Sequence, residues 1–148
     1  MFDGKQFVFL DGAMGTMLQK MGLKTGQKPE IFAFENPGAI LQVHKSYIES
    51  GSDIIYANTF GANRFKMADT GKSVAEIIAN SVSIAKNAAA GKVKVALDVG
   101  PLGEMLEPNG SLSFEEAYEA FKEQMLAGEA AGCDMIVIET MTDLYEAR

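Results

Sequence analysis

Polar side chains follow four apolar runs of the chain, at the points where those runs end. Asp11 follows the first run, Asn58 and Thr59 the second, Asp98 the third and Glu139 the fourth. A carboxylate such as Asp11 would disfavour folding in the middle of a strand, but parallel α/β proteins bind ligands at the carboxyl ends of their strands. Any one of these residues could be a helix cap, whereas all of them together favour a ligand site on one rim.

The four apolar runs predict parallel strands. Each run is short and continuous in apolar residues, which is typical of strands buried on both faces. A glycine-bearing loop and an amphipathic helical stretch separate each run from the next. The chain therefore predicts four βα units, with strands at 7–10, 53–57, 94–98 and 134–139.

Local signals predict where three helices begin and end. One helix starts with a cap residue followed by proline, and two start with a serine and a glutamate at capping-box spacing. A glycine follows each helix where its end is expected. The residues concerned are Asn36, Pro37 and Gly51 for the first helix, Ser73, Glu76 and Gly91 for the second, and Ser113, Glu116 and Gly132 for the third.

Four βα units in succession are compatible with two architectures. One is a small open α/β sheet, and the other is the first half of a (β/α)8 barrel, which typically needs about 250 residues. The length of the chain favours the open sheet. The last helical stretch, "TMTDLYEAR" (140–148), has no end signal, and this favours the half-barrel.

The composition argues against several classes of protein. With 148 residues, 47% hydrophobic and 22% charged, the chain is typical of a soluble globular domain. No run approaches the ~18 apolar residues of a membrane-spanning helix, and "MFDGKQ" lacks the start of a signal peptide, so we expect a cytoplasmic protein. The net charge of -7, with scattered Lys and Arg, argues against nucleic acid and membrane surfaces as partners.

The chain has one cysteine and one histidine. Cys133 cannot form an internal disulfide, and together with His44 it cannot supply the three or four ligands of a typical zinc site. Because "AGCD" begins the fourth predicted strand, Cys133 lies on the rim opposite the strand ends, where we expect a small buried side chain. His44 shares a helical face with Ile40 and Ile48, which favours a packed histidine over a ligand.

The glycines after Asp11 suggest a dinucleotide-binding loop, but the spacing argues against it. "GAMGT" has the pattern G-x-x-G, whereas the dinucleotide fingerprint is G-x-G-x-x-G. Asp11 would also place a negative charge beside the pyrophosphate. We reject this interpretation.

Four blocks, in this order and at these intervals, resemble the homocysteine S-methyltransferase family. They are "LDGAMGTMLQKMG", "HKSYIESGSDIIYANTFGANR", "DVGPLGEML" and "GCDMIVIETMTDLYEA". Within the family they look most like the N-terminal homocysteine-binding domains of cobalamin-dependent methionine synthases. The resemblance implies a (β/α)8 barrel and ends after the fourth strand. It therefore implies that residues 1–148 are the N-terminal half of such a barrel domain.

The resemblance also implies roles for individual residues. The acids that close the first and fourth strands, Asp11 and Glu139, would bind the amino group of homocysteine. The amides of Gly12 and Ala13 would receive its carboxylate. Asn58 and Thr59 would line the same pocket or fix its loops. The implied reaction transfers a methyl group to the thiol of homocysteine and gives methionine.

The chain does not supply the ligands for all the cofactors of the family. Family members bind zinc through three cysteines of later strands, and zinc lowers the pKa of the substrate thiol; those cysteines are absent here. Cobalamin would act through other domains. Two functions stay open: the homocysteine-binding half of a methyltransferase, or a non-catalytic half-barrel that binds an amino acid or a partner half. In either case we expect a homo-oligomer or association with the missing half.

Overall fold

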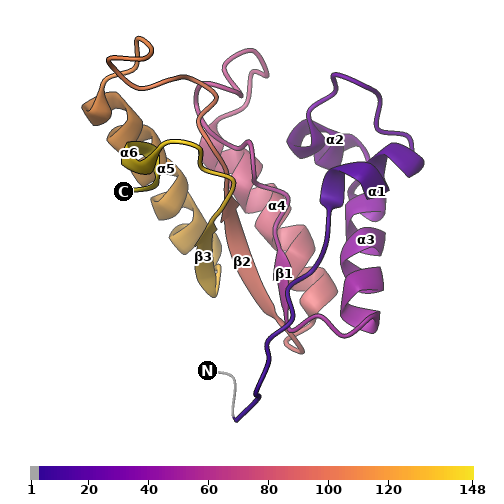
Figure 1. The fold of residues 1–148 in the computed structure, drawn as a ribbon. Helices are drawn as coiled ribbons and strands as arrows, with labels where there is room; N and C mark the ends of the chain where they lie inside the picture. The colour runs from indigo at the N-terminus through magenta and orange to yellow at the C-terminus, as the bar shows by residue number, and fades with distance from the viewer. Residues whose placement is uncertain (1–3) are drawn as a thin grey trace.

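A parallel sheet of three strands lies at the centre of the structure, a computed structural model that describes residues 4–148 (Figure 1). The strands are β1 (Ile54–Tyr56), β2 (Lys94–Val99) and β3 (Met135–Ile138). All pair in parallel, with β2 between the other two. The α/β fold class with parallel strands is therefore confirmed, and three of the predicted strands are present.

The first predicted strand, at 7–10, is reduced to a single bridge. Leu10 pairs in parallel with Ile54, and the N–H of Ile54 donates to the carbonyl of Phe9 at 3.2 Å. The segment thus lies beside β1, and among residues 4–148 no strand pairs with its other side. Because it is an edge segment, its side chains are exposed, with Phe7 at 66% and Phe9 at 63%. The prediction of a strand buried on both faces is wrong here.

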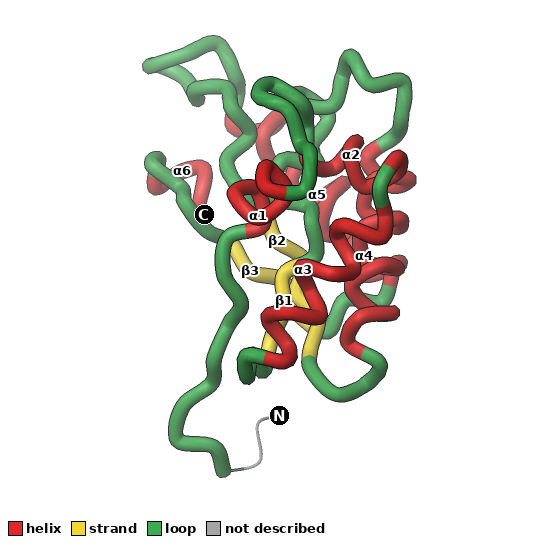
Figure 2. Tube along the Cα trace, turned by 90° about the vertical axis from the view of Figure 1, so that its right-hand side faces the viewer, coloured by secondary structure: helices red, strands yellow, loops and turns green. Residues whose placement is uncertain are grey.

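The described residues form six helices, which connect and cover the strands. In Figure 2, α2 and α4 lie to one side of the strands and α6 to the other. The bounds are α1 (Met14–Lys20), α2 (Pro29–Glu35), α3 (Pro37–Glu49), α4 (Val74–Ala89), α5 (Phe114–Ala131) and α6 (Leu144–Ala147). The helices α1 and α2 were not among those that the sequence predicts.

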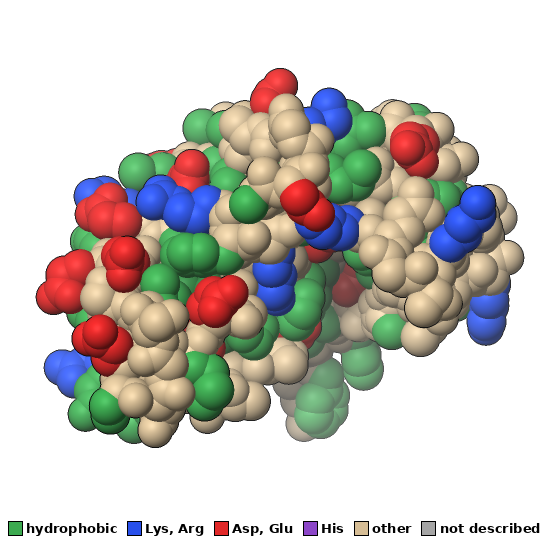
Figure 3. Space-filling view, turned by 90° about the horizontal axis from the view of Figure 1, so that it is seen from above, with side chains coloured by type: hydrophobic (Ala, Val, Ile, Leu, Met, Phe, Trp, Pro, Cys, Tyr) green, Lys and Arg blue, Asp and Glu red, His purple; other side chains and the backbone are tan. Residues whose placement is uncertain are grey.

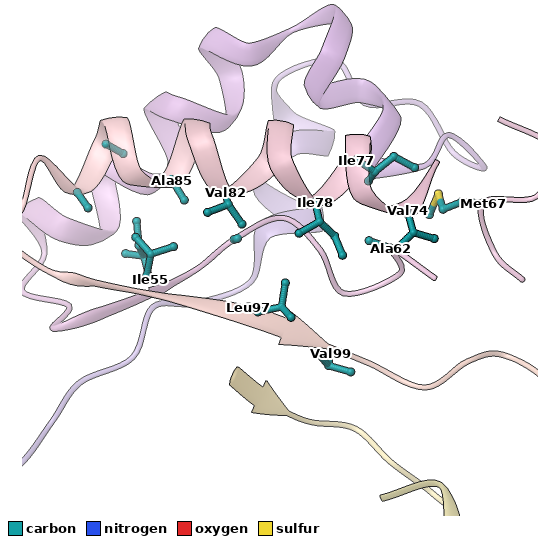
Figure 4. Packing of buried hydrophobic residues seen from close by; sticks show 14 residues of the cluster. Ile55, Ala62, Met67, Val74, Ile77, Ile78, Val82, Ala85, Leu97 and Val99 are labelled. Carbon is teal, nitrogen blue, oxygen red and sulfur yellow. The ribbon is translucent and has the colours of Figure 1, made fainter. Parts of the chain in front are cut away.

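The main core lies between the sheet and α4 (Figure 4). Alternation along the strands places every second side chain on this face. Ile55 of β1 and Leu97 of β2 are fully buried, as are Ile77, Ile78 and Val82 of α4. Apolar burial of this kind contributes most of the stability of a domain, so the core fixes the positions of the strand ends.

All three predicted helix starts are confirmed, two of them with the side-chain capping bonds. The complete capping box is present at Ser73 before α4 and at Ser113 before α5. Asn36 makes no side-chain capping bond to α3, because it also ends α2, where its N–H donates to the carbonyl of Phe32 at 2.8 Å. The chain therefore turns from one helix into the next at Asn36.

The predicted helix ends are close to those observed. α5 ends at Gly132, which has a positive φ of 85° as predicted. α4 reaches its left-handed cap one residue earlier than predicted, at Ala90 with φ 46°. α3 ends just before Gly51, whose φ is 103°.

The open edge of β3 departs from the prediction of strands buried on both faces. Ile136 is 44% exposed and Ile138 is 46% exposed. Both are in register with the core residues Leu97 and Val99 of β2, so they lie on the same face of the sheet, and the described helices leave this face partly uncovered at β3. Within the described part of the chain, no helix is both long and apolar enough to cross a membrane.

Candidate functional site

The carboxyl ends of the strands open into a cleft of about 770 Å³. Figure 3 looks down on this end of the molecule and shows a hollow in the surface, with acidic side chains partly visible inside it. The structure brings all six predicted site residues to this cleft, namely Asp11, Gly12, Ala13, Asn58, Thr59 and Glu139. They come from three separate segments, as the convergence of parallel strand ends requires.

Asp11 directly follows Leu10, the bridge residue, and its side chain is held by β1. Its Oδ2 accepts a hydrogen bond from the N–H of Tyr56 at 3.1 Å. Its Oδ1 is buried and receives no hydrogen bond from any described residue. Burial, with a smaller contribution from the charge of Glu139, raises the pKa of Asp11 from 3.8 to about 7. The side chain therefore has one oxygen fixed by the protein and one left for a ligand.

Tyr47 of α3 packs against the turn that follows Asp11. Its hydroxyl donates to the carbonyl of Ala13 at 3.0 Å. A Cβ at Gly12 would lie 2.9 Å from that hydroxyl oxygen, so any larger residue at this position would force the Tyr47 side chain to move. Neither the N–H of Gly12 nor that of Ala13 donates to the backbone of another described residue. The turn is thus fixed through a carbonyl while two N–H donors stay available.

Asn58 and Thr59 use their side chains to fix the loops of the cleft. The amide of Asn58 donates to the carbonyl of Pro29 at 2.8 Å, which ties the end of β1 to the start of α2. The hydroxyl of Thr59 bonds to the backbone of Asp98. Of the two predicted roles, these bonds favour the fixing of loops.

Two buried acids of the cleft were not among the predicted site residues. Asp98 is 8% exposed and Glu30 is 4% exposed. Burial, then the charges of Glu139 and Asp11, raises the pKa of Asp98 to about 7. Asp98 ends a predicted strand, and the sequence placed it on the rim of strand ends without giving it a role in binding. Glu30 had no such signal, because α2 was not predicted.

Glu30 has a structural role in the cleft. Its Oε1 accepts a hydrogen bond from the N–H of Gly61 at 2.7 Å, and a Cβ at Gly61 would lie 2.9 Å from the same oxygen. Burial raises the pKa of Glu30, although Lys66 and Lys28 act in the opposite direction. Glu30 therefore joins α2 to the loop after β1.

The charges of the cleft favour a cationic group at the strand ends. Four carboxylates line it, from Asp11, Glu30, Asp98 and Glu139, against the ammonium groups of Lys28 and Lys66. Lys28 is paired with Asp69 outside this set, and Lys66 lies over the ring of Phe60, 5.2 Å from its centroid. A cation in the cleft would offset the unfavourable burial of the Asp11 and Asp98 carboxylates.

The residues that the structure describes do not fit a zinc ion. No group of three or more His, Cys, Asp or Glu side chains in residues 4–148 is arranged to hold a metal. Cys133 precedes β3, at the amino end of the strand, and burial raises the pKa of its thiol to about 11. His44 is fully buried in α3, and burial lowers its pKa to about 4. Both lie away from the cleft.

Comparisons with known proteins agree on one family. A family model described as homocysteine S-methyltransferase matches residues 8–148. The chain is 28% identical over 152 residues to the methionine synthase of Mycobacterium leprae (strain TN), which covers 93% of this chain and 12% of that protein. The chain therefore spans only a small part of this relative.

Solved structures share the fold of the chain. The metallated form of the homocysteine methyltransferase MmuM from Escherichia coli superposes with a TM-score of 0.85 at 24% identity, over 97% of this chain and 57% of that one. Its apo form gives a TM-score of 0.71 at 23% identity, over 53% of that chain. The chain spans a little over half the length of these structures.

Proposed function

The chain belongs to the homocysteine S-methyltransferase family, and from this membership we propose that it binds homocysteine in the cleft at the strand ends. In this proposal residues 1–148 are the N-terminal half of a (β/α)8 barrel domain. The complete domain transfers a methyl group to the thiol of homocysteine and gives methionine.

The observation that carries the proposal is the pairing of acids and free amides in one cleft. Asp11 and Glu139 come from opposite ends of the chain and both line it. An ammonium between two carboxylates gains charge-assisted hydrogen bonds, and Oδ1 of Asp11 has no other partner among the described residues. The N–H groups of Gly12 and Ala13 would receive the carboxylate of the same amino acid.

Recognition of the amino-acid end is the part of the reaction that this chain would supply. Zinc activates the substrate thiol in the family, but the residues described above do not fit that ion. We therefore assign no step of thiol activation or methyl transfer to them. In the proposal these steps, and any role of cobalamin, belong to other residues and domains.

A second candidate function is binding without catalysis. The position of Cys133 favours it, because the single thiol of the chain lies away from the cleft. The exposed side chains of Ile136 and Ile138 on β3 favour association with a partner half. This candidate shares the cleft and its ligand class with the first one but lacks the methyl transfer.

Calorimetric titration of the purified chain tests the proposed ligand. We expect L-homocysteine to bind and N-acetyl-L-homocysteine, which lacks the ammonium group, to bind at least tenfold more weakly. The acetylated compound keeps the thiol and the carboxylate, so it is a matched control for the amino group. Equal affinity for both compounds, or no binding of homocysteine, would contradict the proposal.

A further inference from the structure

Asp98 lies on the face of the sheet opposite α4. Alternation along β2 directs Val95, Leu97 and Val99 into the core against α4, so Asp98 lies on the opposite face. It is in register with Val137 of β3. Glu139 follows Val137 by two residues, and its N–H still bonds to the carbonyl of Val99 at 3.1 Å. Because residues two apart on a strand share a face, Glu139 lies on the same side of the sheet as Val137 and Asp98.

The fold itself makes no use of the Asp98 carboxylate. The side chain is 92% buried, since its exposed fraction is 8%. Its Oδ1 is buried and receives no hydrogen bond from residues 4–148, and only its backbone is bonded, to Thr59. Glu30 shows the contrasting case, because its equally buried carboxylate accepts the N–H of Gly61. A buried carboxylate without a partner is unfavourable, and a ligand would supply the missing donor.

Three carboxylates thus surround one region of the cleft. The charges of Glu139 and Asp11 both act on Asp98, and all three residues line the cleft. Asp11 and Asp98 each have one buried oxygen, Oδ1, without a donor among the described residues. The described side chains are not arranged to hold a metal ion, so an organic cation suits the cluster better.

We propose that Asp98 is a further substrate-binding residue, which completes with Asp11 and Glu139 a set of three carboxylates for the three N–H donors of a primary ammonium group. This inference rests on the proposed function, in which an α-amino acid occupies the cleft. A primary ammonium has three N–H donors, and each N-methyl group removes one of them. The cluster therefore selects primary amino acids against N-methylated ones.

Calorimetric titration of the full chain tests this inference with two ligands, L-homocysteine and N-methyl-L-homocysteine. The proteins are the wild type, Asp98→Asn and the control Glu129→Gln, which changes an exposed carboxylate of α5. We expect the wild type and the control to bind homocysteine at least tenfold more tightly than its N-methyl analogue. Asp98→Asn should bind homocysteine about tenfold more weakly and discriminate less between the two ligands.

The possible outcomes separate this inference from the proposed function. If Asp98→Asn binds homocysteine as tightly as the wild type, the inference is overturned while the proposed function stands. If the wild type does not bind homocysteine, both are overturned. If Asp98→Asn fails to fold, the wild type decides alone, because equal affinity for the two ligands overturns the inference and a tenfold preference supports it.

Discussion

The hydroxyl of Thr59 makes two hydrogen bonds to the backbone of Asp98. It accepts from the N–H of Asp98 at 3.0 Å and donates to its carbonyl at 2.9 Å. The ladder between β1 and β2 ends with the bond from Ala57 to Ala96, so the side chain of Thr59 continues the pairing where the β1 backbone turns away. This contact holds Asp98 in place at the cleft.

Replacement of Thr59 tests this contact. Thr59→Val keeps the shape of the side chain but leaves the buried N–H and carbonyl of Asp98 without partners, so we expect a loss of about 2 kcal/mol in the free energy of unfolding. Thr59→Ser should keep most of the stability. Urea unfolding measures both, with the exposed Thr16→Val in α1 as the control. Equal stability of Thr59→Val and the control would show that the contact contributes nothing.

Amide variants test the two acids that we propose bind the amino group. Asp11→Asn and Glu139→Gln each remove a charge from the cleft, and we expect each to weaken homocysteine binding by about 1.5 to 3 kcal/mol, the range for a hydrogen bond to a charged group. Calorimetry measures the change, with Glu129→Gln as control. Unchanged affinity in both variants would remove these residues from the site.

The raised pKa values of Asp11 and Asp98 predict how stability depends on pH. Both groups have a pKa of about 7 in the folded chain against 3.8 as the ordinary value. Between about pH 4 and pH 7 the unfolded chain loses these protons while the folded chain keeps them, so these groups stabilise the fold at pH 4 and lose that contribution as pH rises to 7.

A double variant isolates this effect from the other titrating groups. Asp11→Asn combined with Asp98→Asn removes both protons, so its stability relative to the wild type should increase from pH 4 to pH 7.5. We expect a change on the order of 2 kcal/mol, because one pKa unit corresponds to about 1.4 kcal/mol and the cleft is open to solvent screening. Chemical unfolding at several pH values measures it. A difference independent of pH would contradict the raised pKa values.

Metal analysis tests whether this chain can support zinc chemistry by itself. Because the described residues do not fit a zinc ion, we expect the dialysed chain to hold no stoichiometric zinc and to show no homocysteine methylation by itself. Atomic absorption and a methionine assay measure these properties. One tightly bound zinc per chain together with activity would show that Cys133 and His44 had been misjudged.

The open edges of the sheet predict self-association. Phe9 is 63% exposed beside β1, and Ile138 is 46% exposed on β3, so apolar side chains accompany unpaired backbone at both edges. We expect light scattering at low micromolar concentration to give about twice the chain mass of 15.9 kDa. Ile136→Lys combined with Ile138→Lys should shift the equilibrium toward the monomer. A monomeric wild type that binds no hydrophobic dye would contradict this expectation.

Much of the fold was predictable because its signals are local. The capping boxes at Ser73 and Ser113 depend on residues three positions apart, and both are present. The runs that became β1, β2 and β3 were selected by continuous apolar character, which parallel strands require. The convergence of Asp11, Thr59 and Glu139 on one cleft followed from the common direction of parallel strands.

Other features were decided only by the tertiary structure, because they depend on contacts between residues that are distant in the sequence. The run at 7–10 has strand composition, but with one neighbouring segment it forms a single bridge. The side chain of Glu30 is positioned by its hydrogen bond from the N–H of Gly61, and that of Thr59 by its hydrogen bond to the backbone of Asp98. A local pattern specifies which residues reach a strand end, whereas packing decides which of their polar atoms are satisfied by the protein and which remain for a ligand.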